Sequence, residues 1–326
     1  MTRPRRAFIG VLAAVLVASA SGCGLLSGED PGADGGNTGV EKARIRLGII
    51  PIVDVAPVHI AIQKGYFRDE GVEVELKAIQ GGAAGIPGLV NGELDVTFGN
   101  WVSFLSAQSK GAADLKLVAD GYRGKPEMFL VMTPPDSAVR TPQDLAGKKV
   151  AVNTRANVAE LAVRAALKAK DVDANTVQFT ELAFGDMQAA LVRKDIDAAL
   201  LVEPFITRAQ KEMNAFTVLD TMTGDAAELP IGGYATSAKF AAASPKTVDA
   251  FRRALVKAQR DAGERREVEA VVTGYAKVDA AVASVLHLGL YPSSIDVERL
   301  KSVVSLMKAN GMLSGDVDPG ALLLAR

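Results

Sequence analysis

Residues 89–98 read LVNGELDVTF, and residues 191–200 read LVRKDIDAAL. Both follow the pattern Leu-Val-x-x-acid-aliphatic-Asp-small-x-apolar, which is typical of a helix end, a turn and a buried strand. The two stretches lie about one hundred residues apart, which is too long a period for a solenoid repeat. The repeat therefore predicts two lobes of one architecture. A chance likeness between two helix–turn–strand corners is the alternative.

Predicted strands and helices alternate along the rest of the chain. Strands are predicted at residues 44–51, 72–79, 94–98, 115–119, 148–153, 177–182 and 197–202. Helices are predicted between them at residues 56–64, 86–92, 102–110, 157–169 and 187–194, and Asn157 and Glu160 have the spacing of a capping box. This alternation predicts an α/β fold in which each lobe is a mostly parallel sheet flanked by helices.

Two segments that look extended connect the predicted lobes. Residues 127–133 (EMFLVMT) lie between the copies of the repeat, and residues 230–236 (PIGGYAT) follow the second copy. Further helices are predicted at residues 244–263, 268–276, 280–288 and 296–309. A chain that crosses out and back has discontinuous lobes. We therefore expect lobe 1 to hold residues 44–130 and 234–326, and lobe 2 to hold residues 131–233.

The N-terminus has the pattern of an export signal. Three arginines within the first six residues precede an uncharged apolar run, residues 7–20, which is shorter than the ~20 residues of a bilayer-spanning helix. Residues 20–23 (ASGC) resemble a bacterial lipobox, where the peptide is cut before the cysteine and the thiol is lipidated. This predicts a lipoprotein signal peptide at residues 1–22, lipidation of Cys23 and a flexible tether at residues 23–43. A membrane anchor helix, or a chance cysteine after an ordinary signal, are the alternatives.

The composition excludes several classes of function. The chain has 37 basic and 38 acidic residues, and no basic stripe indicates a nucleic-acid partner. Cys23 is the only cysteine, and His59 and His287 are the only histidines and lie far apart, so no metal site is predicted. His59 falls inside a predicted helix and is interpreted as structural. No cofactor and no catalytic residue are predicted.

Ligands of open parallel sheets bind beyond the carboxyl ends of the strands. Those ends carry hydrogen-bonding groups beside helix N-termini, which favour polar ligand atoms. The sole tryptophan, Trp101, follows a strand and is predicted to be a stacking wall, with a place in the core as the alternative. Asp54, Glu203 and Asn157 have helix capping as the alternative. The predicted ligand-binding residues are Asp54, Ala56, Pro57, Gly82, Asn100, Trp101, Asn153, Ala156, Asn157, Phe184, Glu203 and Tyr234.

Several separated motifs occur in the order of a known family. They are PVHIAIQKGYF at residues 57–67, EGVEV at 70–74, GELDV at 92–96, DLAGKKVAV at 144–152, DIDAA at 195–199 and EPF at 203–205. The set resembles the nitrate/sulfonate/taurine/thiamine-precursor solute-binding proteins of ABC transporters. The resemblance implies a two-lobed periplasmic-binding-protein fold of type II, with two crossings. It places Asp54, Asn100, Asn153 and Glu203 in the cleft between the lobes.

The predicted function is that of an exported, lipid-anchored solute-binding protein on the extracytoplasmic face of the cell membrane. It would capture a small organic solute and deliver it to an ABC permease and ATPase, and we expect it to be a monomer. The ligand would be sulfonate-, taurine- or thiamine-precursor-like, and acid in the cleft makes a plain anion such as nitrate less natural. The alternatives are an enzyme of pyrimidine or thiamine-precursor metabolism on the same fold, and a surface sensor without transport.

Overall fold

The structure is a computed structural model that describes residues 39–313 and 315–324. The described residues belong to one compact unit, residues 37–326. The predicted signal peptide, Cys23 and most of the predicted tether lie outside the described residues.

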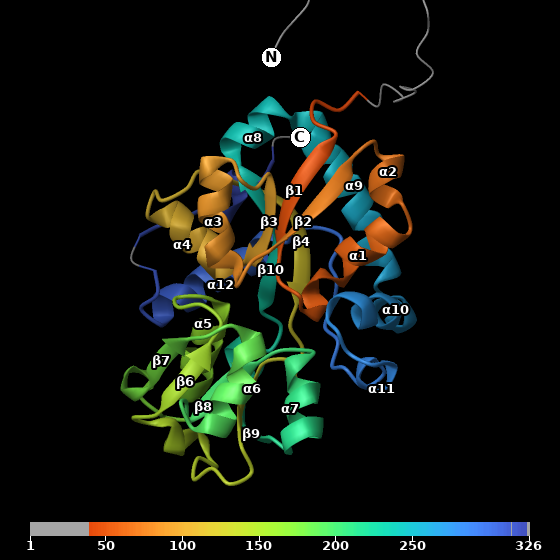
Figure 1. Cartoon of the computed structure of the whole chain (residues 1–326). Coiled ribbons are helices and arrows are strands. Elements are labelled where there is room, and N and C mark those ends of the chain that lie inside the picture. The colour runs from red at the N-terminus through yellow and green to blue at the C-terminus, as the bar shows by residue number, and fades with distance from the viewer. Residues whose placement is uncertain (1–38, 314, 325–326) are drawn as a thin grey trace, which may run out of the picture. The chain divides into compact units, whose positions relative to one another are not determined.

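The first sheet has five strands in the order β2-β1-β3-β10-β4 (Figure 1). Strand β1 pairs in parallel with β2 and β3, whereas β10 is antiparallel to β3 and β4. The bounds are Arg44–Ile49 for β1, Glu73–Ala78 for β2, Val96–Asn100 for β3, Leu115–Arg123 for β4 and Pro230–Ser237 for β10.

The second sheet repeats this arrangement in the order β7-β6-β8-β5-β9. Strand β6 is parallel to β7 and β8, and β5 is antiparallel to β8 and β9. The bounds are Leu130–Thr133 for β5, Lys149–Val152 for β6, Gln178–Glu181 for β7, Ala198–Leu201 for β8 and Phe216–Asp220 for β9. The chain passes from the first sheet to the second between β4 and β5, and returns between β9 and β10.

Helices cover both faces of the first sheet. Helices α1, α2, α9 and α10 pack together on one side, and α3, α4 and α12 lie on the other (Figure 1). The helices connected to the first sheet are α1 (Ala56–Gln63), α2 (Tyr66–Asp69), α3 (Gly82–Asn91), α4 (Trp101–Ser109), α8 (Ala238–Ala243), α9 (Pro245–Asp261), α10 (Arg265–Tyr275), α11 (Ala280–Ala283) and α12 (Val297–Ala309). Those of the second sheet are α5 (Val158–Lys168), α6 (Phe184–Arg193) and α7 (Phe205–Met213).

Local sequence explains where these helices begin and end. Helix α1 has Pro57 in its first turn, where a proline loses no hydrogen bond, and it ends before Gly65, which adopts a left-handed φ of 76°. The capping box predicted for α5 forms only in part. Asn157 accepts a hydrogen bond from the Glu160 backbone N–H, but the Glu160 carboxylate accepts from Ala156 N rather than from Asn157 N.

The sequence repeat forms the same corner in both sheets. The Asp95 backbone N–H donates to Arg46 O at 2.9 Å, and its carboxylate accepts from Arg46 N at 2.9 Å. Asp197 exchanges the same two hydrogen bonds with Lys149, at 2.9 Å and 2.8 Å. Each aspartate therefore ties the start of one strand to its parallel neighbour. The two corners together with the matching strand orders confirm the predicted fold of two α/β units.

The structure corrects several predicted elements. Each sheet is mixed rather than mostly parallel, because the strands of the two crossings run antiparallel to their neighbours. The helix predicted at residues 280–288 ends at Ala283, and both α7 and β9 were missed. The predicted lobe boundaries fall inside β5 and β10, the strands with which the chain enters each sheet, and they remain a prediction.

The two corners differ in charge, which predicts different contributions to stability. The Asp95 side chain is 4% exposed and also binds Lys42 and the Arg46 guanidinium, whereas Asp197 is partly exposed. Asp95→Asn should lower the free energy of unfolding by about 2–3 kcal/mol because two cations lose their partner, and Asp197→Asn by about 1 kcal/mol. Urea unfolding of both variants measures this, and equal losses would contradict it.

Candidate functional site

A small cavity lies between the two sheets, where strands from both of them end. Residues that end β3 or follow β1 line it from the first sheet, and residues that follow β6 and β8 line it from the second. The cavity volume is about 30 Å³, which is enough for about one water molecule. Five residues predicted from the sequence line it: Asp54, Asn100, Asn153, Asn157 and Phe184.

Asn100 joins the two sheets beside this cavity. It precedes α4, and its Oδ1 accepts a hydrogen bond from Ser103 N at 2.8 Å, which caps that helix. The same oxygen accepts from Val158 N at 3.3 Å, at the first residue of α5. Free N–H groups of two helix N-termini, one beside each sheet, therefore converge on one amide oxygen.

Asn153 and Asn157 form a buried polar network on the opposite wall. The Asn157 Nδ2 group donates to Asn153 Oδ1 at 2.8 Å and to Thr154 Oγ1 at 2.9 Å. Asn157 is 1% exposed and Asn153 is 5% exposed. From the first sheet, Gln80 Nε2 donates to Asn153 O at 3.4 Å. The network fixes the Asn153 amide at the cavity wall, and Asn157 also caps α5, so capping and lining coexist in one residue.

Among the described residues, Asp54 is the only ionisable one in the cavity lining. It lies in a short 3₁₀ turn, Val53–Val55, after β1 and is 2% exposed. Burial raises the pKa of its carboxyl to about 7, and only its own backbone N–H acts in the opposite direction. Among the described residues no other group donates a hydrogen bond to this carboxylate. An ionised Asp54 is therefore costly unless a ligand compensates its charge.

Two tyrosines hold the backbone on which Asp54 lies. Tyr275 OH donates to Ile52 O at 3.0 Å, and Tyr291 OH donates to Val53 O at 2.9 Å. His59 stacks on Tyr275 with ring centroids 3.8 Å apart, and burial lowers the pKa of His59 to about 4. His59 therefore has the structural role interpreted from the sequence, as packing behind the Asp54 turn.

Glu203 lies close to the cavity but does not line it. Its Oε1 accepts from Thr207 Oγ1 at 2.8 Å and from His287 N at 3.0 Å, and its Oε2 accepts from Thr207 N at 3.1 Å. Its carbonyl accepts from Val53 N at 3.3 Å. Burial raises the pKa of Glu203 despite these bonds. Glu203 thus connects the end of β8 to segments next to the first sheet, and its predicted ligand contact stays a prediction.

Trp101 and Tyr234 are core residues in the structure. Trp101 is fully buried, packs edge-to-face on Phe104 and fills the space where a side chain on Gly233 would lie. Tyr234 is also fully buried and contacts the rings of Phe98 and Phe251. Neither residue lines the cavity, because α4 turns the Trp101 side chain inward. The alternative interpretation of Trp101 as a core residue describes its place.

Three further predicted residues position the backbone around the cavity. Ala56 and Pro57 are buried in the first turn of α1, directly after Asp54. Gly82 begins α3, and a Cβ atom there would lie 2.5 Å from Gly99 Cα, a distance that real Cβ contacts do not show. Only glycine therefore allows α3 to approach the end of β3 so closely.

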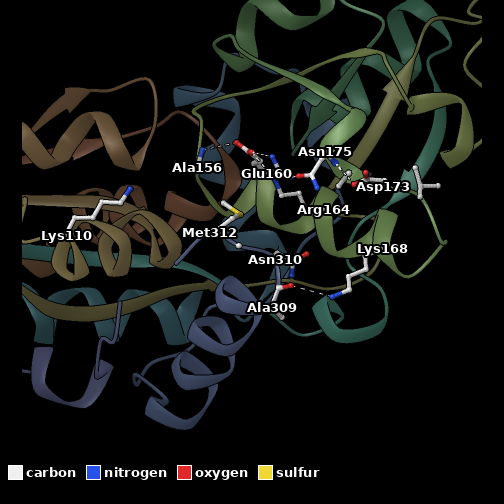
Figure 2. Close-up of a pocket in the computed structure, with 13 residues that line it drawn as sticks. Lys110, Ala156, Glu160, Arg164, Lys168, Asp173, Asn175, Ala309, Asn310 and Met312 are labelled. Atoms are coloured by element: carbon white, nitrogen blue, oxygen red, sulfur yellow. Dashed lines mark hydrogen bonds and ion pairs between the residues drawn. The ribbon is translucent and has the colours of Figure 1, made fainter. Parts of the chain in front are cut away.

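Ala156 lines a different and larger hollow. This outer groove has a volume of about 710 Å³ and lies between α5 and the end of α12 (Figure 2). Its acid Glu160 binds Arg155 and Arg164, and Lys168 Nζ donates to Ala309 O at 3.4 Å. Within the groove, Glu160 and Arg164 are thus paired with each other. The groove contains only Ala156 of the predicted ligand-binding residues, which makes it a weaker candidate than the cavity at the strand ends.

The lining residues missed by the sequence analysis are all apolar. They are Ile50, Ile52, Phe98, Phe129, Val158, Ala159, Val202 and Ile231. Most of them lie within one or two positions of a predicted polar residue, and that adjacency was the available signal. Phe129 and Ile231 come from the two crossing segments, whose side-chain directions the sequence pattern did not specify.

The described part of the chain was also searched for metal-binding clusters and membrane-spanning helices. No group of three or more His, Cys, Asp or Glu side chains there could hold a metal ion. No helix within residues 39–313 and 315–324 is long and apolar enough to cross a membrane.

Solved structures of periplasmic binding proteins share this fold. The alkanesulfonate-binding protein SsuA of Xanthomonas axonopodis pv. citri, bound to MOPS, matches with a TM-score of 0.72 and 19% identity, over 87% of this chain and 98% of that chain. The sulphonate-binding SsuA of Escherichia coli gives 0.68 and 18%, over 87% and 98%. The nitrate-binding protein NrtA of Synechocystis PCC 6803 gives 0.72 and 15%, over 87% and 85%. The two-lobed binding-protein fold is therefore confirmed.

A family model described as NMT1/THI5 like matches residues 52–269. This match spans more than half of the chain, so the chain belongs to the NMT1/THI5-like family. It confirms the family resemblance that the sequence motifs indicated. A comparison with curated proteins found no match.

The buried Asp54 predicts a pH dependence of stability. Its raised pKa means that the folded chain binds a proton more tightly than the unfolded chain between pH ~4 and ~7. Its contribution to the free energy of unfolding therefore falls as pH rises through this window, by about 3–4 kcal/mol at most. Asp54→Asn should remove that part of the slope and stabilise the protein at pH 8.

Urea unfolding at a series of pH values between 4.5 and 8 measures this slope. Asp69→Asn, which changes an exposed carboxylate on α2, is the matched control and should leave the slope unchanged. An Asp54→Asn slope equal to that of the wild type would show that the carboxyl is not desolvated.

Proposed function

We propose that this protein is the extracytoplasmic solute-binding component of an ABC importer, and that it captures a small organic solute between two lobes. Membership of the NMT1/THI5-like family and the binding-protein fold support this proposal. The observation that carries it is the cavity at the strand ends, because residues of both sheets line it. A site shared between lobes allows ligand binding to stabilise a closed arrangement by hinge motion.

The cavity volume indicates that the ligand enters by a movement of the lobes. About 30 Å³ is far below the roughly 300–1,000 Å³ of small-molecule sites. Hydrogen bonds that hold the two walls together next to the cavity include Val158 N to Asn100, Val53 N to the Glu203 carbonyl, and His287 N to the Glu203 carboxylate. Separation of the lobes at these hydrogen bonds would expose both walls of the site.

The chemistry of the lining favours a ligand that carries N–H groups or a positive charge. Asp54 supplies one carboxylate, and no lysine or arginine lines the cavity. Asn100, Asn153 and Asn157 supply amide groups, and Phe184 supplies an aromatic face. A simple anion would meet a negative charge with no cation to offset it. A flat nitrogen heterocycle like a thiamine precursor therefore fits this lining better than nitrate or a plain sulfonate.

Binding is favoured over catalysis by the same residues. The polar side chains of the lining are one carboxyl and three amides. The Asp54 carboxyl could accept a proton, but no nucleophile or second acid–base group lines the described cavity beside it. An enzyme of pyrimidine metabolism on this fold is the second candidate. Turnover of a pyrimidine-like compound by the purified protein would establish that candidate instead.

Loss of ligand affinity in an Asp54 variant tests the proposed ligand class. In a calorimetric screen we expect aminopyrimidine-type heterocycles to bind, and nitrate and ethanesulfonate to show no binding. Asp54→Asn should weaken binding at least about tenfold, because a charge-assisted hydrogen bond is lost. Asp69→Asn, on the outer surface of α2, should bind as the wild type does. Tight binding of nitrate by the wild type would contradict the ligand class and leave the solute-binding role intact.

The anchoring of the protein is a separate proposal. Cys23 lies outside the described residues, and its lipidation rests on the lipobox pattern of the sequence. In a cell fractionation experiment the wild type should sediment with membranes, and Cys23→Ala should be found in the soluble extracytoplasmic fraction.

The other proposed properties are an ABC permease and ATPase as partners and a monomeric state. Co-purification of a permease with the closed form would test the first, and light scattering the second.

A further inference from the structure

A second cavity lies on the first sheet, away from the strand ends that form the proposed cleft. Its volume is about 600 Å³, within the range of small-molecule sites. Edge strand β4 forms its floor with Leu117, Val118 and Ala119, and α9 forms one wall. None of its residues lines the cavity between the sheets.

The position of this cavity follows from incomplete coverage of a sheet edge. On its outer side β4 forms only two isolated bridges among the described residues, from Leu117 to Leu323 and from Arg123 to Leu290. Between those bridges the edge strand has no further strand partner in the described part of the chain. The cavity lies over this gap and is lined by Leu117 and the three residues that follow it, each of which is at most 5% exposed.

One buried carboxylate dominates the polar part of the cavity. Asp120 is 5% exposed, and its Oδ1 accepts from Gly121 N at 2.9 Å. Burial raises the pKa of the Asp120 carboxyl to about 7, and the nearby charge of Asp296 acts in the same direction. The Gly121 N–H, Arg123 and the side chain of Trp101 act to lower that pKa. No salt bridge reaches Asp120 among the described residues. A buried carboxylate without a paired cation is unfavourable on its own.

Groups next to Asp120 also lack partners. Gln259 donates through Nε2 to the Asp120 carbonyl, but its Oε1 is buried without a hydrogen bond in the described chain. The Nε atom of Arg123 is also buried without a hydrogen-bond partner among the described residues. Gln259 and Arg123 adjoin Asp120 but do not line the cavity, so Asp120 is the polar group of this cluster that a ligand in the cavity could reach.

The remaining lining is largely apolar with its own charges already paired. Val256, Ile295 and Leu324 contribute aliphatic surface. At the rim, Arg252 pairs with Asp249 at 2.9 Å, and both side chains are about half exposed. Among the described residues, Asp120 is therefore the acid of the lining that has no salt bridge.

We propose that this cavity is a second ligand site, which binds a small primary amine with an aliphatic body through an ion pair between its ammonium group and Asp120. The ammonium would satisfy the buried carboxylate, and the alkyl body would cover the apolar floor of β4. The site is independent of the solute proposed for the cleft, and either site can exist without the other.

Binding of n-hexylamine at pH 8 tests the proposal, with 1-hexanol as the neutral analogue of similar size. The wild-type protein should bind the amine at least about tenfold more tightly than the alcohol, as measured by calorimetry. Asp120→Asn should abolish that preference, because the carboxylate is lost at constant shape. Asp249→Asn, at the already paired rim, should change the amine affinity by less than about threefold.

A second variant and NMR mapping of the binding site distinguish loss of binding from a folding defect. Val256→Trp adds bulk from the partly exposed face of α9 and should block hexylamine while leaving thermal unfolding near that of the wild type. In amide NMR spectra, hexylamine should shift residues 117–121 and 293–295. Equal affinity for amine and alcohol, undiminished binding by Asp120→Asn, or shifts confined to Asn100 and Asn153 would each overturn the proposal.

Discussion

Two backbone N–H groups from different parts of the chain share the side-chain oxygen of Asn100, and the site depends on this arrangement. One comes from Ser103 in the helix that follows β3, and the other from Val158 in the helix that follows β6. Helix N-termini carry donors that their own helix cannot satisfy. Because parallel strands in each sheet end on the same side, both helices present those donors toward the gap between the sheets. The candidate ligand-binding residues therefore lie at the gap between the sheets, because the strand ends and the helix N-termini meet there.

The polar side chains around Asn100 differ in whether the protein itself supplies their hydrogen-bond partners. Asn153, Asn157 and Glu203 have hydrogen-bond partners within the protein. Asp54 has only its own backbone N–H. The satisfied groups fix the walls and connect the lobes, and the unsatisfied carboxylate is the group with free capacity to recognise a ligand. This division argues for Asp54 as the main determinant of the ligand's charge.

Much of the fold could be predicted from the sequence, because the alternation of strands and helices and the repeat around Asp95 and Asp197 are local signals. The strand ends were also placed well enough to find Asn100 and Asn153. The sequence did not predict whether a side chain that follows a strand points into the core or into the cavity. Trp101 and Asn100 are neighbours in the sequence, yet one packs in the core and the other lines the cavity. Part of that choice depends on Gly233, a contact of Trp101 that is distant in the sequence and that no local pattern contains.

Under the proposed function, the raised pKa of Asp54 also links ligand capture to the acidity of the surroundings. Near pH 7 a substantial fraction of this carboxyl holds a proton. A cationic solute that pairs with it must displace that proton, so uptake and proton release are one exchange. A cell in an acidic medium would capture such a solute less well than the same cell in a neutral one. Calorimetry in buffers of different ionisation enthalpy would register the released proton directly.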